Sequence, residues 1–174
     1  PRARPGVDPA ADDLSQLHRP VLLGDELTHL AGTGLEIPGA GFVDGTVGLG
    51  GHAAAVLRAS APSGRLLGFD RDAEMLERAR ETLAPFGERA RLLHADYREA
   101  PSLLGDERPD GVLLDLGISS VHLDTPERGF SFMSDGPLDM RMDRSQAVSA
   151  ADVVNRTRES ELADLIYRYG DERA

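Results

Sequence analysis

Cysteine and lysine are both missing from this chain of 174 residues, and it contains no long hydrophobic run. Without cysteine, neither a disulfide framework nor a thiolate metal site can form. A membrane protein is disfavoured, because no apolar run approaches the roughly 20 residues that cross a bilayer. No apolar leader opens the sequence, which favours a cytoplasmic setting. We therefore expect a soluble globular protein of one domain or slightly more.

Because lysine is missing, all 19 basic residues are arginine, and they stand against 30 acidic residues, for a net charge of −11. A general attraction of the surface for nucleic acid is disfavoured, so that any RNA contact has to be a local arginine patch. Residues 1–127 hold 12 arginines and 21 acids, whereas residues 128–174 hold 7 and 9. The C-terminal quarter is therefore the part that repels an RNA backbone least.

Four short apolar runs, each closed by an acidic residue or a glycine, follow one another through the middle of the chain. They lie at 41–48, 64–70, 90–96 and 110–117. Short apolar runs without alternation are typical of strands that are covered on both faces of a parallel sheet. Helical patterns lie between these runs, at 52–59, 72–83 and 101–104, and Asp72 is the expected N-cap of the second. This alternation predicts an α/β fold with an open parallel sheet.

The two ends of the chain differ from this middle part. Residues 21–30 carry a short amphipathic helical pattern, and 118–146 have no sustained period and are expected to form a long ordered loop. Helical patterns return at 149–155 and 159–169, and no strand pattern follows them, so we expect the N-terminal part of a longer protein. The expected organisation is a flexible tail at 1–17, a core at 18–126, and a loop with helices at 127–174.

The densest chemical signal is a glycine-rich turn between a strand and a helix, DGTVGLGGH at 44–52. Glycines let the backbone approach a ligand closely, and the amides at a helix N-terminus favour an anionic group. The segment 48–53 also fits the dinucleotide fingerprint G-x-G-x-x-A, and Asp70 stands where an acid would accept hydrogen bonds from ribose hydroxyls. We therefore predict a nucleotide-like cofactor. The alternative is a glycine turn that only permits tight packing.

Acidic residues around this loop favour S-adenosylmethionine over a nicotinamide dinucleotide. Asp44 precedes the glycines, where a carboxylate would attract a cationic ammonium group and repel a pyrophosphate. Asp96 and Asp115 close the next two strands, so the carboxyl edge of the sheet, where open α/β folds bind ligands, is expected to be negative. A sulfonium cofactor suits this edge. An NAD-dependent oxidoreductase that uses the same loop is the alternative function.

Four segments resemble the ribosomal RNA small subunit methyltransferase H family: HRPVLLGDEL at 18–27, VDGTVGLGGH at 43–52, LLDLGISS at 113–120 and ERGFSFMSDGPLDMRMD at 127–143. The resemblance covers residues 18–174, and its last motif is the most specific. It implies a Rossmann-like core, dependent on S-adenosylmethionine and interrupted by an inserted helical substrate domain. It also implies N4-methylation of a cytidine in the decoding region of 16S ribosomal RNA, within the small ribosomal subunit.

Carried over by position, the resemblance also implies a set of cofactor contacts. They are Gly50, Gly51, His52, Asp70, Tyr97, Asp115 and His122. The glycine amides would meet the methionine carboxylate, Asp70 the ribose hydroxyls, and Tyr97 the adenine face. His52 is equally consistent with a capping or core side chain, and His122 receives no proton-transfer role.

Asp115 is the candidate catalytic residue. A cytosine N4 amine is a poor nucleophile because its lone pair is delocalised into the ring. A carboxylate that accepts an N–H bond localises this pair and aligns it with the methyl group. The acid-proline-proline-aromatic signature of many amino methyltransferases is absent, since Leu116, Gly117 and Ile118 follow here. Holding the cofactor or capping loop amides are therefore the other interpretations of Asp115.

The motif at 127–143, with the residue after it, supplies the candidate RNA contacts. Phe130 or Phe132 would stack under a splayed base, and three arginines would contact phosphates, namely Arg128, Arg141 and Arg144. The alternative is that the phenylalanines belong to a core and that nearby aspartates pair with the arginines. No metal site is expected, because the histidines are scattered.

The sequence leaves one further alternative, a truncated binding module that retains the fold without the chemistry. The resemblance implies further strands beyond this chain, and their absence would leave an exposed sheet edge and an incomplete RNA surface. We therefore expect the 174-residue chain alone to be poorly active.

Overall fold

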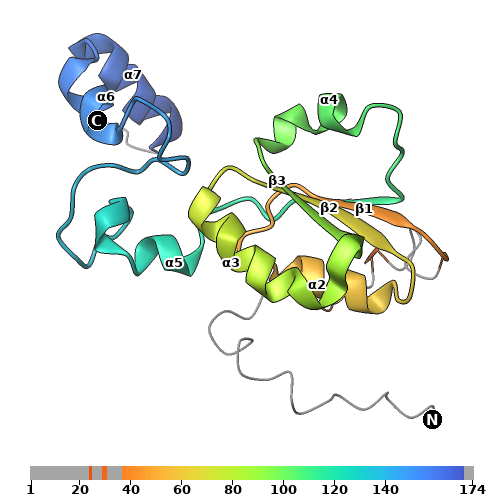
Figure 1. Cartoon of the computed structure of the whole chain (residues 1–174). Helices are drawn as coiled ribbons and strands as arrows, with labels where there is room; N and C mark the ends of the chain where they lie inside the picture. Colours follow the sequence, from red (N-terminus) through yellow and green to blue (C-terminus); the bar gives the residue numbers. More distant parts are fainter. Residues whose placement is uncertain (1–23, 25–28, 31–36, 171–174) are drawn as a thin grey trace. The chain divides into compact units, whose positions relative to one another are not determined.

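The computed structural model of the protein describes Gly24, His29, Leu30 and residues 37–170 (Figure 1). The tail expected at 1–17 and most of the helix expected at 21–30 lie outside these residues. The chain divides into two compact units, Pro1–Leu116 and Gly117–Ala174. This division falls earlier than the expected end of the core at residue 126, because the next short helix belongs to the second unit.

The first unit is built on a parallel sheet, as the sequence predicts. Its strands are β1 (Gly41–Asp44), β2 (Arg65–Asp70), β3 (Ala90–His94) and β4 (Gly111–Leu113), in the order β3-β2-β1-β4. The register pairs Asp44 with Gly68 on one side and with Leu113 on the other. The chain moves outward from β1 through β2 to β3, and then returns to the far side of β1. The carboxyl ends of β1 and β4 therefore flank a topological switch point, where open α/β sheets bind ligands.

Helices cover both faces of this sheet. The helices α2 (Gly51–Ala59) and α3 (Ala73–Leu83) lie on one side, and α4 (Ala100–Leu104) lies on the other (Figure 1). Successive strand residues point to opposite faces, so Phe42 packs in the core beneath α2 and α3 and Val43 in the core beneath α4. Within the described residues, no helix is both long and apolar enough to cross a membrane.

The helix α3 forms where its sequence predicts it. The Asp72 side chain accepts hydrogen bonds from the backbone amides of Glu74 and Met75, which makes it the N-cap. The apolar face of this helix, made of Leu76, Ala79 and Leu83, is buried. The capped and buried helix α3 therefore holds the chain in place directly after β2.

The second unit contains short helical elements and one longer helix. They are α5 (Ser120–Leu123), η4 (Pro126–Arg128), α6 (Ala150–Arg156) and α7 (Glu159–Tyr169). The last two match the predicted helices, whereas α5 and η4 interrupt the loop expected at 118–146. A reciprocal cap between Ser119 and His122 forms α5, and one turn is too short to show an apolar period.

Candidate functional site

The turn from β1 to α2 is fixed by backbone hydrogen bonds to both neighbouring strands. The Gly45 amide donates to the Leu113 carbonyl at 2.9 Å, and the Val47 amide donates to the Phe69 carbonyl at 3.0 Å. The loop is therefore anchored at the ends of β4 and β2 together. This places it at the switch point of the sheet.

Asp44, at the tip of β1, is almost fully buried, with 1% of its surface exposed. Its Oδ1 accepts a hydrogen bond from the Thr46 amide at 3.0 Å. The sequence assigned this carboxylate to a direct contact with a ligand ammonium group. Its burial favours a different contribution, in which Asp44 shapes the turn and supplies negative charge from below the surface.

Asp70, at the tip of β2, joins two parts of the backbone. Its Oδ2 accepts a hydrogen bond from the Gly48 amide at 2.7 Å, and its Oδ1 accepts one from the Asp72 amide at 2.8 Å. Asp70 therefore organises the glycine loop from the end of β2.

The glycines of the loop serve different purposes. Gly48 and Gly50 have φ angles of +54° and +85°, which side chains rarely adopt. A Cβ on Gly50 would also lie 3.3 Å from Cγ of Leu83, and one on Gly45 would lie 2.9 Å from Cβ of Tyr97. Tight packing thus explains why neither Gly45 nor Gly50 carries a side chain. Gly48 has only a backbone oxygen at 4.0 Å, so its requirement is conformational.

His52 and Asp115 lie together at the end of the loop. His52, in the first turn of α2, has 8% of its surface exposed, and its Nε2 lies 3.6 Å from Oδ2 of Asp115. The Asp115 side chain is 55% exposed, and its backbone amide donates to Oγ1 of Thr46 at 2.7 Å. Sequence reasoning missed Thr46. A hydroxyl residue between Asp44 and Gly48 in a strand-to-helix turn is the signal that points to it.

Two arginines compensate the charge of Asp96, which follows β3. The Arg98 guanidinium donates to both carboxylate oxygens at 2.9 and 2.7 Å, and Nε of Arg71 lies 3.7 Å away. The hydrogen bond from Arg98 is the main cause that lowers the pKa of Asp96 from 3.8 to about 2. Asp96 therefore adds little net negative charge to the carboxyl edge of the sheet, because Arg98 and Arg71 lie beside it.

The remaining cofactor candidates are placed differently. Tyr97 begins the short helix η3 (Tyr97–Glu99) and is half-buried beside Gly45, so it borders the loop. His122 belongs to the second unit, where it is buried and its Nδ1 accepts a hydrogen bond from the Ser119 amide at 3.1 Å. Its ring lies 5.4 Å from that of Phe130. Within its own unit, His122 therefore caps a helix and packs in a small core.

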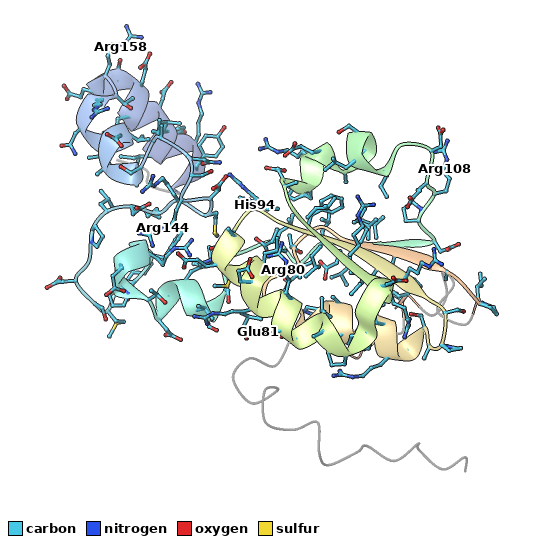
Figure 2. All side chains as sticks on the ribbon, in the orientation of Figure 1. Arg80, Glu81, His94, Arg108, Arg144 and Arg158 are labelled. Carbon is cyan, nitrogen blue, oxygen red and sulfur yellow. The ribbon has the colours of Figure 1, made fainter. Side chains whose placement is uncertain are left out.

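Arg128 and Arg141, both proposed for RNA contact, donate to groups of their own unit. Arg128 is buried, and its Nη2 donates to the carbonyls of Arg141 and Met142 at 3.1 Å each. Arg141 donates through Nε and Nη2 to both oxygens of Asp139 at 2.8 Å, and this pair holds the pKa of Asp139 well below its usual range. Arg144 has an exposed side chain (Figure 2). The local geometry thus favours a structural role for Arg128 and Arg141.

Comparison with known proteins places this architecture in a family. The sequence profile described as the MraW methylase family matches residues 15–174. The chain belongs to the MraW methylase family. The expected resemblance is thereby confirmed, and neither the oxidoreductase nor the binding-module alternative receives support.

Relatives of this MraW family member carry a more specific name, "Ribosomal RNA small subunit methyltransferase H". The protein of that name from Syntrophotalea carbinolica is 55% identical over 78% of the chain and 44% of its own length. That from Thermobifida fusca is 52% identical over 90% of the chain and 48% of its own length. The chain therefore spans about half the length of the curated relatives it matches.

Among solved structures, an S-adenosylmethionine-dependent O-methyltransferase from Thermotoga maritima aligns with 68% of the MraW-family chain and 42% of its own length. The identity is 22% and the TM-score is 0.49. This likeness is too distant to add to the family assignment.

Proposed function

We propose that this MraW family chain binds S-adenosylmethionine at the loop 44–52, and that the protein to which it belongs methylates N4 of a cytidine in 16S ribosomal RNA. The observation that carries the proposal is the anchored glycine loop at the switch point, which Asp70 organises and Asp115 borders. The relatives named as small subunit ribosomal RNA methyltransferases support the choice of reaction.

The residues present suit this cofactor. The first turn of α2, which begins at Gly51, offers backbone amides to the methionine carboxylate. Asp70 lies at the end of β2 against the loop, where the family resemblance assigns it to the ribose hydroxyls, and the half-buried ring of Tyr97 offers an apolar face to adenine. The buried charge of Asp44 favours a cation near the loop, because water screens it little there. A pyrophosphate would meet repulsion from the same charge.

The bound cofactor would supply an electrophilic methyl group on a sulfonium centre. Asp115 would then orient the nucleophile, because its carboxylate is exposed while Thr46 holds its backbone amide. By accepting an N–H bond from the target amine, this carboxylate localises the nitrogen lone pair and receives the proton that methylation releases. Asp115 is therefore proposed as the catalytic residue, and contact with the cofactor is its second proposed role.

The RNA contact is proposed to use residues that reach the surface. Phe132 is fully exposed, whereas Phe130 is buried, so Phe132 is the better candidate for stacking on a splayed base. Among the three arginines, Arg144 is the one with an exposed side chain, which makes it the candidate for a phosphate contact. The partner would be 16S ribosomal RNA within the small subunit. Because this RNA lies within the small ribosomal subunit, the proposed reaction takes place in the cytoplasm.

The test is to incubate small ribosomal subunits with the protein that carries this chain and with S-adenosylmethionine labelled in its methyl group. Mass spectrometry of the RNA nucleosides should then detect the label on N4 of cytidine. Asp115→Asn should reduce the labelling by about 10²-fold or more, the usual effect of a lost general base. Label on a ring carbon, on a ribose oxygen or on no nucleoside would refute the proposed reaction.

A further inference from the structure

Strand pairing brings one histidine against the proposed catalytic carboxylate. His52 follows the loop after β1, and Asp115 follows β4, which pairs directly with β1. The imidazole Nε2 and the carboxylate Oδ2 lie 3.6 Å apart. Within the described part of the chain, His52 is the one basic side chain at ion-pair distance from Asp115.

The two members of this pair have opposite environments. His52 is buried in the first turn of α2, so the backbone of a regular helix restricts its ring. The Asp115 side chain is about half-exposed, so its carboxylate is available to a substrate. A buried group that contacts an exposed reactive one can hold it in place without touching the substrate itself.

A second contact restrains Asp115 from the same loop. Its backbone amide donates to Oγ1 of Thr46 at 2.7 Å, and the Gly45 amide donates to the Leu113 carbonyl at 2.9 Å. Thr46 therefore fixes the backbone, and His52 lies where it can fix the carboxylate.

We infer that His52 is a positioning residue that orients the Asp115 carboxylate toward the target amine. When substrate binds, the imidazole closes on the carboxylate and its N–H at Nε2 donates to Oδ2, which stops the carboxylate from rotating and leaves Oδ1 to accept the N–H of the substrate. A separation of 3.6 Å in the protein without substrate is consistent with this role, because catalytic hydrogen bonds often shorten only when substrate binds. The inference rests on the proposed function of Asp115.

The test compares two replacements of the histidine in the protein that carries this chain. His52→Leu removes the donor and keeps an apolar side chain in the buried position, whereas His52→Gln keeps an amide N–H close to the position of Nε2. His52→Leu should lower kcat by about 10- to 100-fold, because a misplaced reactive group costs up to about 10²-fold. Its dissociation constant for S-adenosylmethionine, measured by calorimetry, should not change. His52→Gln should recover most of kcat.

The matched control is His94→Gln at the end of β3. His94 is labelled in Figure 2, and its Nε2 contacts the Arg71 carbonyl at 2.9 Å. His94 is not at ion-pair distance from Asp115. This variant should retain the parental kcat. If His52→Leu does not fold, as judged by thermal unfolding, His52→Asn takes its place, because its shorter amide cannot reach the position of Nε2.

Three results would overturn the inference. They are an unchanged kcat in His52→Leu, an equal loss of kcat in the Leu and Gln variants, and a weaker affinity for S-adenosylmethionine with kcat retained at saturation. A double-mutant cycle adds a fourth test. If His52 acts through Asp115, adding His52→Leu to Asp115→Asn should cause little further loss, whereas additive losses contradict the inference. Failure of the parental protein to bind the cofactor or methylate RNA would instead refute the proposed function.

Discussion

Asp70 connects the glycine loop to the beginning of α3 through its two carboxylate oxygens. The Gly48 and Asp72 amides donate to different oxygens of this one side chain. Charge-assisted hydrogen bonds of this kind are roughly twice as strong as neutral ones. The conformation of the loop therefore depends on an acid that the sequence assigns only to a ligand contact.

Asp70→Asn should weaken the binding of S-adenosylmethionine. The amide turns one acceptor into a donor that faces a backbone N–H, and an unsatisfied bond of this kind costs about 1–3 kcal/mol. Calorimetry should show a dissociation constant about tenfold higher or more. Asp106→Asn, at an exposed turn of the same unit, is the control and should bind as the parent does. Equal affinity of the Asp70→Asn variant and the parent would contradict this account of the loop.

The sequence predicts the residues of the loop better than it predicts their contacts. The glycines and Asp70 can be read from spacing, because a strand-to-helix turn and a strand-end acid have clear local signatures. The contact of His52 with Asp115 cannot be read in this way, because it requires β4 to pair with β1. The charge compensation of Asp96 by Arg71 likewise depends on β2 lying beside β3. Such contacts follow from strand order.

At the scale of elements, the positions of the strands and longer helices were predictable and their lengths were less so. The run expected at 110–117 contains a strand of three residues, Gly111–Leu113, because the chain turns away to place Asp115 beside Thr46. The helix α5 was missed because a single capped turn shows no apolar period. The helix α7 forms over its predicted range, but its apolar residues Leu165 and Ile166 are exposed.

The carboxyl end of β3 should show a titration that depends on Arg98. Asp96 has a folded-state pKa of about 2, below its ordinary value of 3.8. A lowered pKa means that the ion pair stabilises the fold above about pH 3.8 and that this stabilisation is lost as the pH falls to about 2. The effect on the free energy of unfolding should be small, because Arg98 is mostly exposed and water screens the pair.

Arg98→Ala should therefore raise the pKa of Asp96 toward 3.8, incompletely because Arg71 remains 3.7 Å away. Nuclear magnetic resonance of the carboxyl carbon measures this pKa directly. Arg80→Ala, in the helix α3, removes an exposed arginine that pairs with Glu77 and should leave the Asp96 titration as it was (Figure 2). An unshifted titration in Arg98→Ala would show that the bidentate pair is not the cause.

For the whole molecule, a net charge of −11 restricts how it can meet RNA. The contact with RNA has to be a local arginine patch. Arg128 and Arg141 donate hydrogen bonds within their own unit, which reduces the number of arginines that can contact RNA. The sequence left open that these arginines pair with nearby acids; Arg141 does pair with Asp139, whereas Arg128 donates to backbone carbonyls. The sequence could not separate them from Arg144, because burial and carbonyl partners depend on how the motif folds back on itself.

Arg144→Ala should weaken binding to 16S ribosomal RNA and reduce the slope of affinity against salt by about one unit, as expected for one lost phosphate contact. Because the Arg144 side chain is exposed, the free energy of unfolding should change less than in Arg141→Ala. Arg141→Ala should instead lower the free energy of unfolding, because Asp139 and the carbonyls of Arg144 and Gln146 lose their donor.

Two measurements separate these variants, urea unfolding and filter binding at several salt concentrations. Arg108→Ala, an exposed arginine of the first unit labelled in Figure 2, controls for the loss of one positive charge. It should change neither quantity by much. An Arg144→Ala protein that binds RNA as the parent does, at every salt concentration, would remove Arg144 from the proposed contact.

The claim on which the chemistry depends is that the anchored loop at the tip of β1 receives a cationic methyl donor. Isothermal titration of S-adenosylmethionine into the protein measures this directly, with NAD as the competing ligand. The account predicts saturable binding of one S-adenosylmethionine per chain and no heat with NAD. Saturable binding of NAD, or no heat with S-adenosylmethionine, would contradict it.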